Sequence, residues 1–363
     1  MKKEIISDIQ GISLIILFMT GTSSILVMGI DAQQDAWLAV IIGIFMVLVI
    51  SLIYIRLNYL FPDKDLFDII FFCFGNFIGK IICTLFTWYA YHTSIMVTLS
   101  ISQFIVTTNL VETPHTLVTI GVMLLCIWGV KEGLEVLGKI SQFFLNLYIF
   151  LIASMILLLI PEMDIARILP ILNQGFIPIL KGAFFTFSFP LGEVVVFSMV
   201  FSQFKTKKSS IKIYWWGLAI GGVIIILISL MNILVIGSGN ILSSYYPTYN
   251  TASRVRFLYF VPSLTIILTM VFIIGGFIKV SIYLMAISKG ISKIFGIYNY
   301  RSIVTCSALH IINLTIYLYD SLMAMVEWNL EVWPYYAIPF QILLPMLILI
   351  ISEIKNKHKS ISS

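Results

Sequence analysis

The chain is built mainly from long runs of apolar residues that contain no charged side chain. Nine such runs reach at least 18 residues, close to the roughly 20 that one transmembrane α-helix requires. A tenth run, Gly182–Phe204, is interrupted only by Glu193. The nine uninterrupted runs are Ile9–Ile30, Ala36–Ile55, Ile81–Val111, Thr113–Val130, Ile140–Pro161, Ile213–Ser253, Phe257–Ile278, Ser302–Tyr319 and Val332–Ser352. This pattern predicts about ten membrane-spanning helices, here called spans 1 to 10.

The polar positions between the runs set the expected bounds of each span. Pro62–Gly79 is expected to lie on the cytoplasmic membrane surface as a short amphipathic segment before span 3. Strands of a transmembrane β-barrel would be about 10 residues long and would alternate in polarity, so the long uniform runs exclude that architecture. Spans 1 to 10 are expected at about 9–30, 37–57, 80–108, 114–131, 141–160, 179–204, 213–237, 257–288, 302–322 and 333–354.

The ten spans use most of the chain and divide into five plus five. Spans 1 and 6 would cross the membrane in opposite directions, so the second half is inverted relative to the first, as in many secondary transporters. The expected repeats cover about residues 9–160 and 179–354. The predicted fold class is an all-α membrane protein, a single transmembrane domain over residues 1–363 with no room for an enzymatic domain. No motif points to catalysis, a metal or a cofactor, so an enzyme is not expected.

Composition supports the assignment to the membrane, and the distribution of charge predicts the orientation of the chain in it. Hydrophobic residues make up 60% of the sequence and charged residues 11%, whereas soluble domains are about a quarter charged. With the N-terminus inside, cytoplasmic segments hold 17 of the 22 Lys and Arg residues, outer segments hold 4 and span 8 holds one. This bias predicts that both ends are cytoplasmic. Loops beside anionic lipid explain the net charge of +5, so no nucleic-acid partner is expected.

Small and hydroxyl residues interrupt the middle of span 1. Gly21, Thr22, Ser23 and Ser24 follow one another, and such residues weaken a helix while their hydroxyls can satisfy freed backbone groups. If span 1 unwinds here, the N-terminus of its outer half would face a small anion such as a carboxylate. The alternative is close helix packing by small residues, and the sequence does not decide between the two.

A second interruption combines a proline, a glycine and an acid in the middle of span 6. Pro190 lacks a backbone donor, and Gly192 makes unwinding easier. Glu193 follows at membrane depth, where a charged side chain is costly and is usually functional. We therefore expect a functional break in span 6 with Glu193 beside a ligand. The alternative is a protonated Glu193 that only bonds a neighbouring helix.

Three further polar residues are candidates for the same site. Lys279 lies deep in span 8. It is either a fixed cation near the site, paired with Glu193 or replacing a coupling ion, or a side chain that snorkels to the surface. Tyr89 and Thr93 lie four residues apart on one face of span 3. They line a polar cavity in one interpretation and form an interhelical hydrogen-bond seam in the other.

Several motifs, in this order and spacing, resemble a known family. Together they identify the chain as similar to the spore germination permeases, the B-type subunits of bacterial endospore germinant receptors, within the amino acid–polyamine–organocation transporter superfamily. The resemblance covers nearly the whole chain, and the motif Phe187–Val194 is its most specific part. The other motifs are Ser7–Gly11 leading to Gly21, Gly75–Lys80, Glu112–Pro114, Tyr246–Thr248, Phe277–Lys279 and Leu344-Pro345.

The resemblance implies a leucine-transporter-like fold with spans 1 and 6 broken and a nutrient site between spans 1, 3, 6 and 8. It also implies a larger membrane subunit and a lipoprotein subunit as partners, in the inner membrane of the spore. Many relatives have a glycine pair and then a proline in span 1, where this chain has Thr22-Ser23-Ser24 and Met28, so the pocket shape and the ligand stay open. The matching ligand-binding positions are Gly21, Thr22, Ser23, Ser24, Tyr89, Thr93, Pro190, Gly192, Glu193 and Lys279.

Three functions are compatible with this pattern. The favoured one is a receptor subunit that binds a small nutrient, expected to be an amino acid, at the membrane midplane and triggers spore germination with partner subunits. The second is a secondary amino acid transporter, with protons moving through Glu193. The third is a scaffold for partner subunits with a vestigial pocket. All three share one fold, so fold cannot choose between them.

Overall fold

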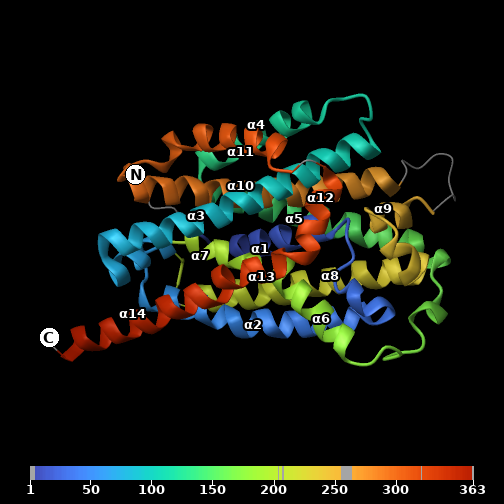
Figure 1. The fold of residues 1–363 in the computed structure, drawn as a ribbon, viewed down its shortest axis with the longest axis horizontal. Coiled ribbons are helices and arrows are strands. Elements are labelled where there is room, and N and C mark those ends of the chain that lie inside the picture. The colour runs from blue at the N-terminus through green and yellow to red at the C-terminus, as the bar shows by residue number, and fades with distance from the viewer. Residues whose placement is uncertain (1–4, 203, 207, 255–263, 320, 362–363) are drawn as a thin grey trace.

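The computed structural model describes residues 5–202, 204–206, 208–254, 264–319 and 321–361, with side chains described as far as residue 357. Regular structure in these ranges is helical, apart from one isolated bridge between Ile6 and Phe204. The helices run side by side along the long axis of the molecule, and both ends of the chain lie at the same end of the bundle (Figure 1).

The first half of the chain begins with a well-capped helix. The Gln10 N–H donates to the Ser7 hydroxyl at 3.4 Å, and the Ser7 N–H donates to Gln10 Oε1 at 3.1 Å, which satisfies two free donors at the start of α1. The α4 helix begins directly after Pro114, as expected. The elements of this half are α1 Asp8–Ser23, η1 Ile30–Asp35, α2 Ala36–Leu60, α3 Leu66–Thr108, α4 His115–Glu132, α5 Leu134–Leu159, η2 Ile160–Glu162 and η3 Ile165–Ile168.

The second half contains more short elements than the first because two of its spans are irregular. Both irregular stretches contain a proline, which removes a backbone donor from the helix. The elements are α6 Ile177–Thr186, η4 Phe187–Leu191, η5 Gly192–Val195, α7 Val196–Val200, α8 Ser209–Leu242, α9 Pro247–Ala252, α10 Leu264–Phe295, η6 Tyr300–Ser302, α11 Val304–Tyr317, α12 Leu322–Glu331, α13 Trp333–Ile338, η7 Pro339–Leu343 and α14 Leu344–Ile361.

The number of membrane-spanning helices agrees with the sequence. Within the described residues, eight helical stretches are long and apolar enough to cross a membrane, and the bent pair α11 and α12 makes nine if it forms one span. The apolar helix α1, at 16 residues, is shorter than these. With α1 included, the helices account for the ten predicted spans. The prediction of a polytopic all-α membrane protein is confirmed.

Glycines decide where several helices depart from the expected bounds. Gly75, with φ at +73°, divides α3 four residues before the expected boundary at Gly79, so the amphipathic segment is already helical from Leu66. Gly133, with φ at +105°, is the single residue between α4 and α5. Because glycine tolerates positive φ, this one-residue turn lets α5 begin at Leu134, seven residues earlier than expected.

The region of span 9 differs most from the expectation. Span 9 was expected over residues 302–322, but α11 ends at Tyr317. The helix α12 then follows at an angle of 99° to α11. This additional helix was not predicted from the sequence. Residues 257–263 at the expected start of span 8, and Asp320, lie outside the described residues.

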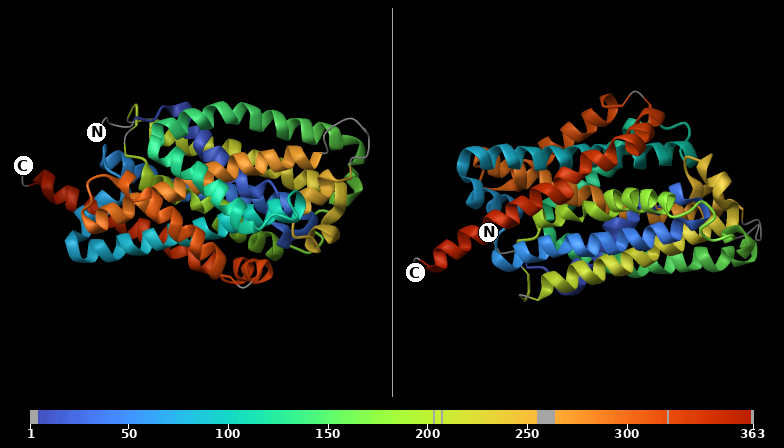
Figure 2. Two further views of the ribbon diagram at one scale, coloured as in Figure 1. Left: turned by 90° about the horizontal axis from the view of Figure 1, so that it is seen from above. Right: turned by 60° about the horizontal axis from the view of Figure 1, so that its bottom comes forward.

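The first helix lies at the centre of the bundle. Every residue of α1 except Asp8, Ile9 and Ile12 is buried, and α1 packs against α5, α8 and α10. The Lys205 N–H donates to the Ile6 carbonyl at 3.3 Å, so the loop after α7 lies beside the N-terminal segment. The C-terminal part of α14 extends beyond the bundle at this same end (Figure 2).

Candidate functional site

Span 6 is broken at the position that its proline and glycine predict. The helix α6 passes into η4, a wider turn, and then into η5, a tighter one, before α7 continues. Phe189 inside η4 is extended, with φ at −147° and ψ at 122°, and Pro190 has no N–H to donate. All residues of η4, η5 and α7 are buried. Backbone carbonyls freed at this break therefore need partners from within the protein.

Glu193 and Lys279 form an ion pair directly beside the break. Glu193 Oε2 lies 2.5 Å from Lys279 Nζ, and both side chains are 0% exposed. The fully buried Tyr283 of α10 lies beside Glu193. Close opposite charges offset much of the cost of removing each from water, although such a pair adds little net stability. The pairing excludes the interpretation that Lys279 snorkels to the membrane surface.

The Lys279 ammonium group connects three parts of the bundle. It donates to Thr22 Oγ1 at 2.9 Å. It also lies over the rings of Phe18 and Phe189, at 5.2 and 4.7 Å from their centroids. Ring faces attract a cation, especially where water is excluded. The ammonium thus joins α1 and the broken span 6 to α10, and its charge balances that of Glu193.

A small cavity borders the ion pair. It measures about 70 Å³, room for about five water molecules at roughly 15 Å³ each. Its lining is mainly apolar but includes the hydroxyls of Thr22, Thr93 and Ser100 and the side chain of Glu193. Neither carboxylate oxygen of Glu193 has a hydrogen bond of good geometry among the described residues, although Lys279 and Tyr283 lie close to it. A buried acceptor without a partner at a cavity wall can take a donor group from a ligand.

The far wall of the cavity comes from residues that were not among the predicted ligand-binding positions. Tyr246, just before α9, lines this wall together with Met325 and Asn329 of α12. The helix α9 lies at the end of the bundle opposite the two chain ends (Figure 1). Burial raises the pKa of the Tyr246 phenol, so this wall carries no phenolate charge. The cavity therefore lies between the central ion pair and the end of the molecule away from the termini.

Two predicted residues of span 1 meet α10 in different ways. Thr22 lines the cavity and accepts the hydrogen bond from Lys279. Gly21 packs against the backbone of Gly275, which is the close-packing arrangement that the sequence offered as an alternative. Of these two residues, only Thr22 is in a position to touch a ligand.

The other two predicted residues of span 1 bond to their own helix. Ser23 donates to the Met19 carbonyl at 2.8 Å, and Ser24 donates to the Gly21 carbonyl at 2.7 Å. The α1 helix ends at Ser23, and the chain then runs through turns to η1 instead of starting a second half-helix. Among the described residues the helix ends at Ser23, and no second half-helix presents its N-terminus to the cavity.

The predicted residues of spans 3 and 6 differ in their distance from the cavity. Thr93 lines it, and its hydroxyl donates to the Tyr89 carbonyl at 2.8 Å. Tyr89 is not among the lining residues, and its ring stacks on Phe340 with centroids 4.8 Å apart. Pro190 and Gly192 shape the broken segment and are also absent from the lining. The structure thus brings Thr22, Thr93 and Glu193 together around the cavity, with Lys279 behind Glu193.

Two buried residues of span 10 reach the same break and were not predicted. Gln341 Nε2 donates to the Ser188 carbonyl at 2.8 Å, and Trp333 Nε1 donates to the same oxygen at 3.1 Å. Gln341 could have been noticed as the only amide in the apolar run 332–352, because polar groups at membrane depth are usually functional. Trp333 gave no signal, since aromatic residues are common throughout this chain.

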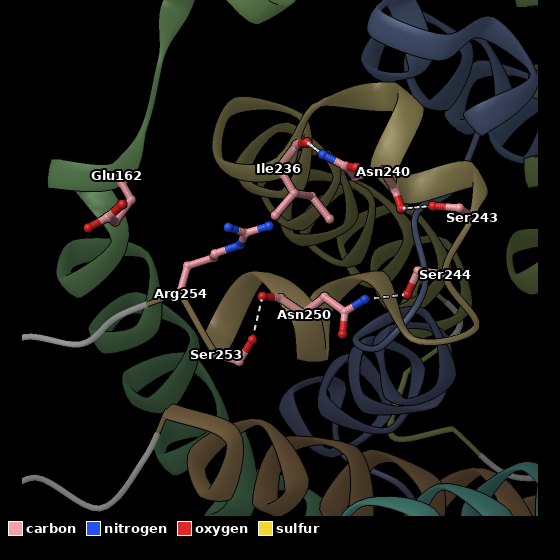
Figure 3. A pocket seen from close by; sticks show the side chains of 8 residues that line it. All are labelled: Glu162, Ile236, Asn240, Ser243, Ser244, Asn250, Ser253 and Arg254. Carbon is pink, nitrogen blue, oxygen red and sulfur yellow. Dashed lines mark hydrogen bonds between the residues drawn. The ribbon is translucent and has the colours of Figure 1, made fainter.

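A second, larger hollow lies elsewhere on the molecule and holds none of the predicted site residues. It is open and measures about 840 Å³. Figure 3 shows it among the ends of α8, α9 and η2, with Arg254 pointing toward Ile236 and Asn250 bonded to Ser244. Among the described residues, no group of three His, Cys, Asp or Glu side chains could hold a metal ion. The cavity at Glu193 is therefore the candidate site.

Two solved structures of one transporter, Mhp1, have a similar helix arrangement. The structure of Mhp1, a nucleobase-cation-symport-1 family transporter, in a closed conformation with bromovinylhydantoin bound, superposes with a TM-score of 0.69 over 95% of this chain and 77% of that chain, at 9% identity. The inward-facing conformation of Mhp1 gives a TM-score of 0.58 over 96% and 76%, at 11% identity. At such low identity the likeness shows the fold alone, and it confirms the predicted transporter-like fold.

Relatives that are similar in sequence show which family the chain belongs to. Spore germination protein KB of Bacillus subtilis (strain 168) is 28% identical over 99% of this chain and 97% of its own length. Putative spore germination protein YfkT of the same organism is 22% identical over 90% of this chain and 89% of its own length. The family model described as spore germination protein matches residues 5–322. With the fold of a permease and a match over most of its length, the chain belongs to the spore germination protein family.

Proposed function

We propose that this protein is the nutrient-binding membrane subunit of a germinant receptor. It binds a small nutrient, an amino acid, at the membrane midplane, and it passes the resulting conformational change to partner subunits that trigger germination. The single observation that carries the proposal is Glu193. Its carboxylate is fully buried, is paired with Lys279, and belongs to a side chain that lines a small cavity.

The chemistry of the cavity fits an amino acid. A ligand ammonium group can donate to the Glu193 carboxylate, and the hydroxyls of Thr22 and Thr93 can bond its polar atoms. The mainly apolar remainder of the lining suits a small aliphatic body. A space of about 70 Å³ favours a compact molecule over a large one. These features support ligand binding, whereas a scaffold with a vestigial pocket would not need a costly buried charge at a cavity wall.

The proposed partners are a larger membrane subunit and a lipoprotein subunit, together in the inner membrane of the spore. The relatives named spore germination proteins support this assignment. Almost the whole described chain lies in the helix bundle, so a signal must leave through helix contacts with other subunits. The proposed orientation has both chain ends and the Lys205–Lys212 loop in the cytoplasm, supported by the basic residues gathered there.

The proposal is tested first by deleting the gene in a spore-forming host and screening single amino acids for lost germination. Complementation with Glu193→Gln should raise the amino acid concentration needed for a half-maximal response at least tenfold, because the ligand loses a charged acceptor. Glu162→Gln is the matched control, since Glu162 lines the larger hollow instead. An unchanged dose-response in Glu193→Gln, with normal protein level, would overturn the proposed binding role.

A measurement of amino acid uptake distinguishes the receptor from the transporter alternative. The purified subunit is reconstituted into liposomes, and uptake of a labelled amino acid that triggers germination is measured against empty liposomes. A receptor subunit alone should bind this amino acid without concentrating it. Steady accumulation by the lone protein would instead favour a secondary transporter.

A further inference from the structure

Gln341 is a fully buried amide in η7, the wide turn between α13 and α14. A wide turn of this kind shifts the backbone hydrogen bonds of a helix and often marks a functional position. The backbone carbonyl of Gln341 accepts from the Tyr54 hydroxyl of α2 at 2.5 Å. A side-chain amide at this depth is costly unless its polar groups are bonded. The hydrogen bonds of the Gln341 side chain therefore indicate its role.

The amide of Gln341 bonds a carbonyl whose α-helical donor is directed elsewhere by the break in span 6. In an α-helix the Ser188 carbonyl would accept from the N–H of Gly192, four residues on. Here the Gly192 N–H donates to Phe187 instead. Gln341 Nε2 supplies the missing donor to Ser188 at 2.8 Å, and it also donates to the Tyr89 hydroxyl at 3.1 Å.

The same side chain also packs against the residue that precedes Glu193. A Cβ placed on Gly192 would lie 2.7 Å from Gln341 Cδ, a separation that real Cβ atoms essentially never show. The amide therefore occupies the space beside Gly192 and bonds the carbonyl of Ser188. Ser188, near the start of the irregular segment, and Gly192, directly before Glu193, are therefore both in contact with one residue of span 10.

We propose that Gln341 is a positioning residue of the nutrient site. It holds the irregular part of span 6 from span 10, and this sets the direction in which Glu193 meets the cavity and Lys279. The inference rests on the proposed function, because it assumes that a ligand contacts Glu193. A residue that only stabilised the fold would affect protein level, whereas a positioning residue also changes the sensitivity to nutrient in protein that is correctly folded.

The test replaces Gln341 by a residue of similar length without an amide, Gln341→Met, in spores that carry this receptor as their only one. The control is Gln142→Met, because Gln142 is an exposed glutamine on α5. A third variant, Gln341→Glu, keeps the shape and can still donate one hydrogen bond when protonated. The probe is an equimolar mixture of the twenty common L-amino acids, and each strain gives a half-maximal concentration, a maximal rate and a membrane protein level.

We expect Gln341→Met to raise the half-maximal concentration at least tenfold while the protein level stays within twofold of the parent. Gln341→Glu should give an intermediate shift, and Gln142→Met should give none. A parental half-maximal concentration for Gln341→Met, at normal protein level, overturns the inference. Equal shifts for Gln341→Met and Gln142→Met overturn it as well.

Trp333→Phe provides the second test in case Gln341→Met does not accumulate. It removes one donor to the Ser188 carbonyl but keeps an aromatic ring in place. A shift of severalfold supports the role of this carbonyl in positioning Glu193, and a parental response contradicts it. Failure of the proposed function is recognised separately, because then Glu193→Gln itself responds normally, whereas failure of this inference leaves Glu193→Gln defective.

Discussion

Gly21 of α1 and Gly275 of α10 are in backbone contact, so that a Cβ added to Gly21 would lie 2.5 Å from the Gly275 carbonyl carbon. This contact lies one residue before Thr22, which accepts the hydrogen bond from Lys279. The small residues thus bring α1 and α10 close enough for a lysine on one helix to bond a hydroxyl on the other. The close approach of α1 and α10 is therefore a condition for the hydrogen bond between Lys279 and Thr22.

The first prediction concerns this contact. Gly21→Ala should destabilise the protein by about 1–3 kcal/mol, because the added methyl group meets backbone rather than a flexible side chain. Thermal unfolding of the detergent-solubilised protein measures the effect. Gly121→Ala is the control, since a Cβ on Gly121 in α4 would meet nothing within 4 Å and should leave stability unchanged or slightly raised. Equal melting temperatures for the two variants would contradict the prediction.

The second prediction concerns the buried ion pair. Lys279→Met leaves Glu193 without its partner, and we expect a cost of about 3–5 kcal/mol and a lower protein level in membranes. Glu193→Gln should lower the level too, and the double variant Glu193→Gln with Lys279→Met should recover part of it. Quantitative immunoblots of membrane fractions measure all three.

The control for the ion pair is an exposed pair of the same chain. Lys181 lies 2.9 Å from Asp31, with 75% of its side chain exposed, and surface pairs contribute little to stability. Lys181→Met should therefore accumulate normally. If the double variant accumulates no better than its two parents, Glu193 and Lys279 do not depend on each other.

The third prediction follows from the position of the Lys279 ammonium group. A fixed cation already balances Glu193 between α1, span 6 and α10, so a coupling sodium ion should not be needed there. Replacing all sodium by N-methylglucamine should change the half-maximal amino acid concentration by less than twofold. A sodium-dependent response would show that an ion site lies elsewhere and that Lys279 does not replace it.

The fourth prediction concerns orientation. In a background with the exposed Cys306 replaced by serine, the other three cysteines are buried. A membrane-impermeant maleimide applied to intact cells should then label Ser243→Cys, at the end opposite the termini, and spare the exposed loop variant Lys205→Cys. Permeabilised cells should show labelling of both. Labelling of Lys205→Cys in intact cells would reverse the proposed topology.

Much of the fold could be predicted because hydrophobicity is a local property. An apolar run of sufficient length must cross the membrane as a helix that bonds its own backbone, whatever its neighbours are. The break in span 6 was also readable, since Pro190 and Gly192 act on the backbone where they stand. Glu193 and Lys279 could be identified as site residues because a charged side chain at membrane depth is energetically costly and is usually functional.

The outcomes that could not be predicted depend on partners distant in sequence. The sequence alone left open whether Lys279 snorkels or pairs with Glu193, since the packing of α10 against span 6 decides it. Whether span 1 unwinds at Gly21 or packs closely there was open for the same reason. Small residues are equally compatible with unwinding and with the contact to Gly275 that the structure shows.

The sequence by itself determined the class of the protein, its approximate spans and the costly residues around which a site must form. Only the tertiary structure placed α12 beside the cavity and brought Gln341 to the Ser188 carbonyl. The physical reason is that a backbone group freed at a break inside the membrane can take its donor from any neighbouring helix. That choice depends on packing across the bundle, which no local pattern in the chain encodes.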